Sequence, residues 1–389
     1  SIMNKDTIST KSKLQQLVES IGAKYAPDRR VEVYSIEVVE YDGAIQLKGE
    51  TTSTAALKEL AEGAKSIAPH IENHIDTLPS ETIGENCWGI VYNSVGNLHS
   101  QPTHKSDMVS QLLLGMPVRV LDKLDDWLRI QAPEGYIGWV CGSIERMNGR
   151  ELQARLQKPT IIVTCQYAKS YSKADIYSQS VSDVVIGNIF TLDGKEDNFY
   201  KIIYPDGREA YIEKQNAKEV DSWLSDIELT GKSIVNTAKQ LMGVPYVWGG
   251  TSSKGLDCSG FTKIIYWLHG IIIPRDASQQ VLCGVEVDNK GDFEKVQKGD
   301  LLFFGTKATD ENTKERVVHV GIYIGNKQFI HAHDYIRINS FNPHDKLFDQ
   351  FNTNRYLRTM RYIGSERAIG ITPILDHPFY SKTSLTDDE

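Results

Sequence analysis

One cysteine and two histidines have the setting that nucleophilic catalysis requires. Cys258 follows a Gly-rich loop, residues 249–255, and stands at the start of a predicted helix. A thiol attacks as its thiolate, and a helix N-terminus lowers a thiol pKa through its dipole and unpaired N–H groups. His319 and His331 lie in neighbouring predicted strands, joined by a tight turn. We therefore expect a cysteine nucleophile, with one histidine as its base and the other orienting that base.

The sequence after the cysteine favours a close approach of substrate to backbone. Ser259 and Gly260 follow Cys258 directly. Small residues there let the first-turn N–H groups receive an oxyanion. His319 sits within a β-branched strand, where an unpaired imidazole would be costly, so we expect it to have a polar partner.

The sequence gives less support to other roles for the cysteine and histidine residues. A cysteine with two histidines could bind zinc, but metal sites normally show ligand pairs at close spacing, and only His331 and His333 come near that. We expect no metal and no other cofactor. We interpret the other cysteines as inert packing residues: Cys87, Cys141, Cys165 and Cys283.

The elements around these residues predict an α+β domain over residues 225–364. Apolar side chains at helical spacing predict one helix over 231–242 and a second over 258–270. Three strands follow, over 301–304, 317–324 and 328–332. Helices followed by an antiparallel meander are typical of α+β folds.

Two small β-barrels are predicted before this domain, over residues 84–147 and 158–222. Short strands bounded by Gly, Pro, Asn or Asp recur in both segments. The strand at 199–202 repeats the one at 127–130, which indicates an internal duplication. The first segment resembles the bacterial SH3 (SH3b) domain in its motifs Gly115–Leu121, Asp126–Ile130 and Gly135–Val140.

The ends of the chain carry less information. Residues 1–80 predict helix, hairpin, helix and strand, a small α+β domain that weakly resembles BON-type domains. The tail at 365–389 is predicted to be irregular, without an assigned role.

Composition narrows the classes of partner. The 389 residues carry a net charge of −8, which argues against a nucleic-acid partner. No stretch approaches the roughly 20 apolar residues of a membrane span. Since no signal core is present at Ser1, we expect either a mature envelope or periplasmic protein whose leader was removed, or a cytoplasmic protein. Oligomeric state is not predicted.

Six motifs in order resemble the NlpC/P60 family of papain-like cysteine peptidases, which cut bacterial cell-wall peptides. They lie at Pro245–Gly250, Asp257–Phe261, Pro274–Asp276, Gly299–Phe304, His319–Tyr323 and Phe329–Ala332. The resemblance implies Cys258 as nucleophile, His319 as base and His331 as orienting residue. It also implies that Tyr246 and Asp257, next to the nucleophile, position the substrate and shape the oxyanion region, with Ser259 beside them.

The order of two SH3b domains and one NlpC/P60 domain is similar to that of the γ-D-glutamyl-L-diamino acid endopeptidases, the dipeptidyl-peptidase VI group. This implies cleavage of the γ-D-Glu–diamino acid bond in murein peptides with a free N-terminal L-Ala. It implies that the first SH3b domain covers the active site and selects the N-terminus through a carboxylate and a tyrosine. The matching positions are Asp107, where the group often has Glu, and Tyr136; Ser278 is a further expected substrate contact.

Two alternatives stay open. The SH3b domains could hold the protein on intact cell wall while the last domain trims it. Related papain-like domains also act as amidases or acyltransferases on other substrates.

Overall fold

The computed structural model describes residues 5–311 and 314–381, so the last part of the predicted tail, 382–389, lies outside the described residues. In these ranges no helix combines the length and apolar character that a membrane crossing requires.

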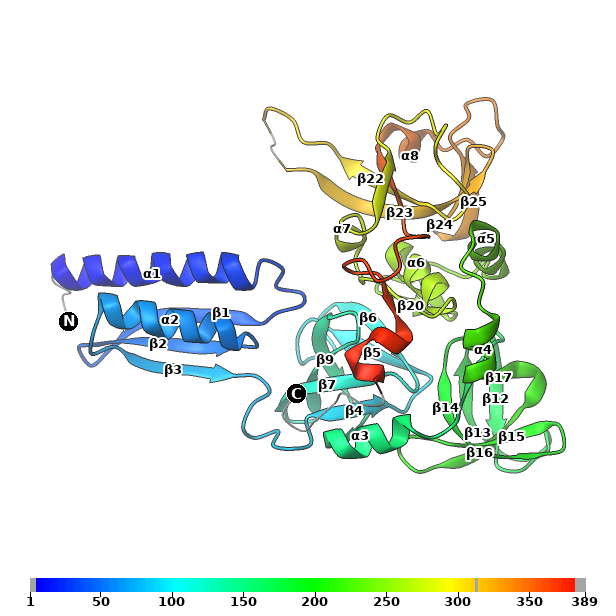
Figure 1. The fold of residues 1–389 in the computed structure, drawn as a ribbon, viewed down its shortest axis with the longest axis horizontal. Coiled ribbons are helices and arrows are strands. Elements are labelled where there is room, and N and C mark those ends of the chain that lie inside the picture. Colours follow the sequence, from blue (N-terminus) through cyan, green and yellow to red (C-terminus); the bar gives the residue numbers. More distant parts are fainter. Residues whose placement is uncertain (1–4, 312–313, 382–389) are drawn as a thin grey trace.

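The N-terminal unit packs two helices on a three-stranded sheet (Figure 1). Its elements are α1 (Lys5–Tyr25), β1 (Tyr34–Tyr41), β2 (Ala44–Thr51), α2 (Thr54–Ile67) and β3 (Glu72–Thr77). Leu14, Val18 and Ile21 form the buried stripe of α1. Asp42 and Gly43 both have positive φ and make the tight turn between β1 and β2. The unit therefore has the predicted order of elements.

The next unit is a seven-stranded antiparallel sheet. Its strands are β4 (Trp88–Val91), β5 (Val95–His99), β6 (Met108–Leu113), β7 (Pro117–Leu124), β8 (Trp127–Gln131), β9 (Ile137–Cys141) and β10 (Ile144–Met147). They pair in the order β10-β4-β7-β8-β9-β5-β6, and among the described residues β10 and β6 do not pair to close a ring. Alternating apolar side chains such as Val118, Val120 and Ile130 are fully buried in one core.

A second seven-stranded sheet repeats this topology. After α3 (Gly149–Leu156) come β11 (Thr160–Val163), β12 (Tyr167–Tyr171), β13 (Ser180–Val185), β14 (Ile189–Glu196), β15 (Phe199–Ile203), β16 (Glu209–Glu213), η1 (Lys214–Asn216) and β17 (Ala217–Glu219). Their order, β13-β12-β16-β15-β14-β11-β17, matches the first sheet strand for strand. The predicted duplication is thus confirmed at the level of topology. We call these units the first and second SH3-like sheets.

The last unit places helices against a six-stranded antiparallel sheet. Its elements are α4 (Val220–Asp226), α5 (Gly231–Gln240), β18 (Thr251–Ser252), β19 (Gly255–Leu256), α6 (Cys258–Trp267), β20 (Ile271–Ile272), α7 (Ala277–Gln280), β21 (Val285–Asp288), β22 (Leu301–Thr306), β23 (Arg316–Gly325), β24 (Gln328–His333), β25 (Tyr335–Ser340), α8 (Gln350–Asn354) and β26 (Tyr356–Arg361). The sheet order is β21-β26-β22-β23-β24-β25. The three predicted strands are its centre, while β21, β25 and β26 were not predicted. The whole fold is α+β, as expected.

The C-terminal segment is more ordered than its sequence indicates. β27 (Thr372–Pro373) pairs with β20, and η2 (Ile374–Asp376) and η3 (Pro378–Tyr380) follow. Tyr380 is buried against Trp267 of α6 and Leu113 of the first SH3-like sheet. The segment therefore packs the last unit onto the first SH3-like sheet (Figure 1).

Candidate active site

A capped helix start fixes the position of Cys258. Asp257 is the N-cap of α6, and its Oδ1 accepts a hydrogen bond of 2.7 Å from the backbone N–H of Gly260. Gly249 shapes the loop before it: its φ is +80°, and a Cβ there would lie 2.2 Å from the carbonyl oxygen of Met108. Only glycine allows the loop to come this close to the first SH3-like sheet.

A buried arginine holds this cap in place. Arg275 is 1% exposed and donates to both carboxylate oxygens of Asp257, at 3.0 and 2.6 Å. It also donates to Ser259 Oγ at 2.9 Å. The bidentate pair orients the carboxylate and compensates its charge. Arg275 lies in a motif quoted above, but its role was not predicted.

The thiol itself is neutral in this environment. Solvent reaches part of Cys258, yet burial and the charge of Asp257 together raise the pKa of its thiol to about 11. Arg275 and the backbone N–H groups of Val320 and Ser259 act in the opposite direction. The predicted lowering by the helix N-terminus is wrong here, because desolvation and the neighbouring carboxylate outweigh it.

The two histidines form a hydrogen-bonded chain with one further residue. His319 Nε2 lies 2.8 Å from His331 Nδ1, and His331 Nε2 lies 2.8 Å from Asn339 Oδ1. The Asn339 amide donates to the carbonyl of Leu347 at 3.1 Å, so its oxygen faces His331. Burial lowers the pKa of His331 to about 4, so this ring is neutral at neutral pH.

This chain fixes the tautomer of each ring. His331 must carry its proton on Nε2 to donate to Asn339, which leaves Nδ1 as the acceptor for His319 Nε2–H. The free lone pair of His319 is therefore on Nδ1. Burial, aided by the His331 ring and the cation of Arg355, holds the pKa of His319 well below its usual range. Asn339 was missed by sequence reasoning, since nothing in its local sequence marks it.

Helix α6 packs against β23, which carries His319. Cys258 shares a cavity wall with Val317 and Val318, the two residues before His319 in β23. Within the described residues no hydrogen bond joins the thiol to the imidazole; the raised pKa of the thiol and the lowered pKa of His319 leave both groups neutral at neutral pH.

The cavity over the thiol brings together most of the predicted substrate contacts. Its volume is about 310 Å³, and we call it the thiol cavity. The predicted residues among those that line it are Tyr136, Tyr246, Asp257, Cys258, Ser259 and Ser278. Tyr136 comes from the first SH3-like sheet, so this sheet forms part of the wall. Burial raises the pKa of Tyr246 to about 12, so its hydroxyl remains a donor.

One predicted contact lies elsewhere. Asp107 is exposed, in the loop before β6, and does not line the thiol cavity; Val109 does. The carboxylate beside Tyr136 is instead Asp276, whose Oδ2 accepts a hydrogen bond of 3.2 Å from the tyrosine hydroxyl. Asp276 directly follows Arg275 in the motif Pro274–Asp276 quoted above, and its place in that motif is the sequence signal that could have marked it as a site residue.

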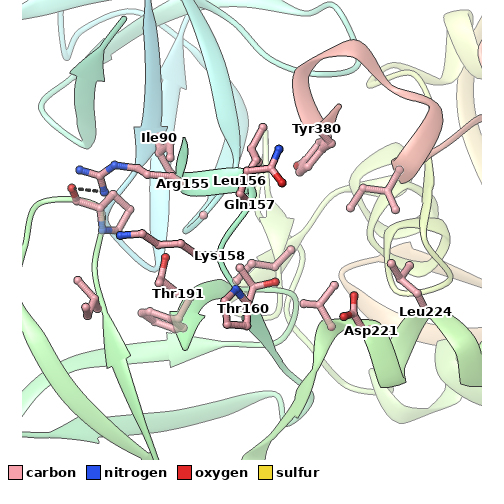
Figure 2. Close-up of a pocket in the computed structure, with 18 of the residues that line it drawn as sticks. Ile90, Arg155, Leu156, Gln157, Lys158, Thr160, Thr191, Asp221, Leu224 and Tyr380 are labelled. Atoms are coloured by element: carbon pink, nitrogen blue, oxygen red, sulfur yellow. Dashed lines mark hydrogen bonds between the residues drawn. The ribbon is translucent and has the colours of Figure 1, made fainter. Parts of the chain in front are cut away.

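A second cavity lies between the two SH3-like sheets, away from this chemistry. It has a volume of about 270 Å³, and Figure 2 shows Arg155, Lys158, Asp221 and Tyr380 among its lining residues. Arg155 donates to the carbonyl of Pro205 at 2.9 Å. Among the described residues no cysteine or histidine lines it, so it offers no cysteine–histidine pair. Across the described residues no cluster of His, Cys, Asp and Glu side chains is arranged to hold a metal ion.

Comparison with known families matches two parts of the chain. The model described as "NlpC/P60 family" matches residues 243–360, which contain the thiol and both histidines. The model described as "Bacterial dipeptidyl-peptidase Sh3 domain" matches residues 98–143, within the first SH3-like sheet.

Curated relatives extend over several units. Gamma-D-glutamyl-L-lysine dipeptidyl-peptidase of Bacillus cereus is 34% identical over 238 residues, which are 59% of this chain and 68% of that protein. Dipeptidyl-peptidase 6 of Lysinibacillus sphaericus is 26% identical over 271 residues, which are 67% of this chain and 94% of that protein.

Solved structures agree with the fold. A crystal structure of an NlpC/P60 family protein from Bacillus cereus is 28% identical, with a TM-score of 0.59, and the match covers 71% of this chain and 99% of that chain. An NlpC/P60 endopeptidase from Photobacterium damselae subsp. piscicida has a TM-score of 0.54 at 15% identity, over 95% of this chain and 94% of that chain. The second likeness concerns the fold alone and includes most of the chain.

Proposed function

Because the chain belongs to the NlpC/P60 family of peptidases, we propose that it is a cysteine endopeptidase that cleaves the γ-D-glutamyl–diamino acid bond of short peptidoglycan stem peptides. One observation carries this proposal: α6, which begins at Cys258, packs against β23, which carries His319 of a tautomer-fixed histidine pair, and Cys258 lines a cavity partly walled by the first SH3-like sheet. A cavity of about 310 Å³ suits a short peptide better than a crosslinked polymer.

The proposed reaction begins from the neutral pair. As the Cys258 sulfur attacks the γ-carbonyl carbon, its proton moves to His319 Nδ1. The imidazolium keeps its hydrogen bond to His331, and the first-turn N–H groups of α6 stabilise the developing oxyanion. His319 then protonates the leaving amine of the diamino acid. Water, deprotonated by His319, hydrolyses the thioester and releases the L-Ala-γ-D-Glu dipeptide.

Two residues that line the thiol cavity suit the substrate N-terminus. Tyr136 and Asp276 offer a hydroxyl and a carboxylate to the α-ammonium of L-Ala. The names of both relatives describe dipeptidyl-peptidases, which is consistent with recognition of a free N-terminus. In this proposal Asp276 is the carboxylate that binds the substrate N-terminus, the role that the resemblance implied for Asp107. Such peptides arise at the cell wall, so we propose the cell envelope as the site of action, with the cytoplasm as the alternative.

The test uses L-Ala-γ-D-Glu-L-Lys and its diaminopimelate counterpart. We expect wild type to release L-Ala-γ-D-Glu from at least one of them, and Cys258→Ala to lose at least about 1,000-fold in kcat, because no nucleophile remains. Cys141→Ala removes an exposed thiol and serves as the matched control. Turnover by Cys258→Ala at the wild-type rate would contradict the thiol mechanism.

A wall-bound hydrolase remains the second candidate, favoured by exposed aromatic residues on the second SH3-like sheet. Tyr177 is 90% exposed and Tyr167 is 58% exposed. Incubation with purified sacculi discriminates the two functions: strong sedimentation together with release of wall fragments supports the second candidate, and cleavage of free peptides alone supports the first.

A further inference from the structure

An arginine of the N-terminal unit reaches the edge of the thiol cavity. Arg30 lies in the connection between α1 and β1, almost 250 residues before the side chains that it contacts. Its Nη1 is 3.2 Å from Asp276 Oδ2 and 2.6 Å from Ser278 Oγ. Both partners line the cavity, whereas Arg30 is not among its lining residues. The N-terminal unit therefore contacts the substrate-facing residues directly.

Several hydrogen bonds hold the arginine at this place. Asp28 accepts from Arg30 Nε at 2.8 Å and from Nη2 at 3.1 Å, and it also accepts from Gln279 of α7 at 2.8 Å. The carbonyl of Arg30 accepts from the backbone N–H of Ile137, at the start of β9, at 2.8 Å. The arginine is thus fixed between the first SH3-like sheet and the last unit, unlike a mobile surface side chain.

This contact changes the charge that the cavity presents. Asp276 Oδ2 accepts from both the Tyr136 hydroxyl and the Arg30 guanidinium. A carboxylate that already pairs with a guanidinium attracts an additional ammonium less strongly. The cavity should therefore distinguish a charged substrate N-terminus from a neutral one less sharply than an unpaired aspartate would.

We propose that Arg30 is a specificity-determining residue that acts through Asp276 and reduces the preference of the thiol cavity for a cationic group. The identity of that group as the α-ammonium of a stem peptide rests on the proposed function. The N-terminal unit thereby sets the range of N-termini that the enzyme accepts.

Kinetics with paired substrates test this role. L-Ala-γ-D-Glu-L-Lys and its N-acetyl form are compared in wild type, Arg30→Gln and Arg30→Lys. Gln can keep a hydrogen bond but removes the charge, so we expect KM for the free amine to fall about two- to fivefold, with kcat and the N-acetyl KM unchanged. Lys keeps the charge and should keep the wild-type ratio. A merely structural role would raise KM for both substrates alike, and that result, or a smaller free-amine preference in Arg30→Gln, overturns the proposal.

A second measurement needs no peptide cleavage. Methanethiosulfonates with a trimethylammonium or a sulfonate group form a mixed disulfide with the Cys258 thiolate and release methanesulfinate. The ratio of cationic to anionic labelling at Cys258, followed by mass spectrometry, should rise about two- to fivefold in Arg30→Gln and fall in Asp276→Asn. An unchanged ratio in Arg30→Gln refutes the inference even if the peptidase proposal holds. A changed ratio supports it even if neither peptide is cleaved.

A neighbouring arginine provides the matched control. Arg129 of the first SH3-like sheet pairs with Glu50 of the N-terminal unit at 2.7 Å but does not line the thiol cavity. Arg129→Gln removes a cation from the same interface between units, so it should leave both the KM ratio and the labelling ratio at the wild-type value. If it changes them as Arg30→Gln does, the effect comes from docking of the N-terminal unit and not from charge at Asp276.

Discussion

At the scale of single residues, two pKa shifts bear on the proposed mechanism, in which the proton moves from Cys258 to His319 during attack and no ion pair forms beforehand. The pKa of the Cys258 thiol is raised to about 11, whereas the pKa of His319 is held well below its usual range. Both shifts have burial as their largest cause, and both disfavour the charged forms. In the proposed mechanism His319 accepts the proton as a neutral base, and its lowered pKa keeps it neutral into mildly acidic solution.

This argument predicts the acid limb of the pH profile and the effect of one substitution. Protonated His319 cannot act as base, so kcat/KM should fall only well below pH 6.5. The cation of Arg355 contributes to the lowered pKa, so Arg355→Gln should raise that pKa and move the acid limb to higher pH. The measurement is kcat/KM against pH. The control is Arg358→Gln, which removes an equal charge that is paired with Glu315 and Glu286 and should leave the acid limb in place. If the acid limb of Arg355→Gln moves to lower pH, the assignment of this limb to His319 is contradicted.

The candidate site residues that the sequence proposes are those carried by short local motifs. Cys258, His319 and His331 each lie in a segment whose residue order is itself informative. The sequence did not predict the roles of Asn339 and Arg30, because each role depends on a contact that only the folded chain creates. Asn339 acts through the pairing of β24 with β25, and Arg30 through a contact between separate units. The charge state of the Cys258 thiol was also not predicted, because a position at a helix start does not reveal how deeply the thiol is buried.

At the scale of elements, the start of α6 depends on a buried ion pair. The Arg275 side chain is 1% exposed and that of Asp257 is 13% exposed, so neither group is well solvated if its partner is lost. We expect Asp257→Asn to lower the free energy of unfolding by about 3 to 5 kcal/mol, because it leaves an uncompensated buried cation. The double variant Asp257→Asn/Arg275→Met should lose less than Asp257→Asn alone. Urea unfolding of the single and double variants measures this coupling.

The exposed pair Arg367–Asp376 is the control for this prediction. Its side chains are 73% and 41% exposed, so Asp376→Asn should change stability by less than about 0.5 kcal/mol. If Asp257→Asn proves as mild as Asp376→Asn, the pair does not hold the cap in the way its burial suggests.

Strand prediction succeeded for three consecutive strands of the last unit and missed β21, β25 and β26. β22, β23 and β24 form consecutive apolar runs and hairpins, and these were expected. β26 pairs with β22, which lies about 50 residues earlier in the chain, and among the described residues β21 pairs with β26 alone. Strands with distant partners gain their stability from those partners, so their sequences alone are weak signals.

At the scale of the whole molecule, the first SH3-like sheet contributes to the wall of the thiol cavity and holds the loop before Cys258. Gln111 of β6 and Thr251 of β18 exchange three hydrogen bonds of 2.9 to 3.1 Å, which join this sheet to the loop before Cys258. Val109 and Tyr136, from the same sheet, line the thiol cavity. The tandem order of the units was predictable from motifs, whereas these contacts between units were not, because they depend on how the folded units dock.

We therefore expect that loosening this junction weakens substrate binding more than it affects chemistry. Thr251→Val keeps the shape of the side chain but removes the hydroxyl that bonds to both the N–H and the carbonyl of Gln111. KM for the free tripeptide should rise about fivefold or more, with kcat within about twofold of wild type, since the thiol and the histidine chain are untouched. Thr54→Val, at an exposed helix position in the N-terminal unit, is the matched control and should leave both constants unchanged. A fall in kcat at constant KM would instead mean that the junction holds the nucleophile and not the wall, and the role assigned to the first SH3-like sheet would have to be abandoned.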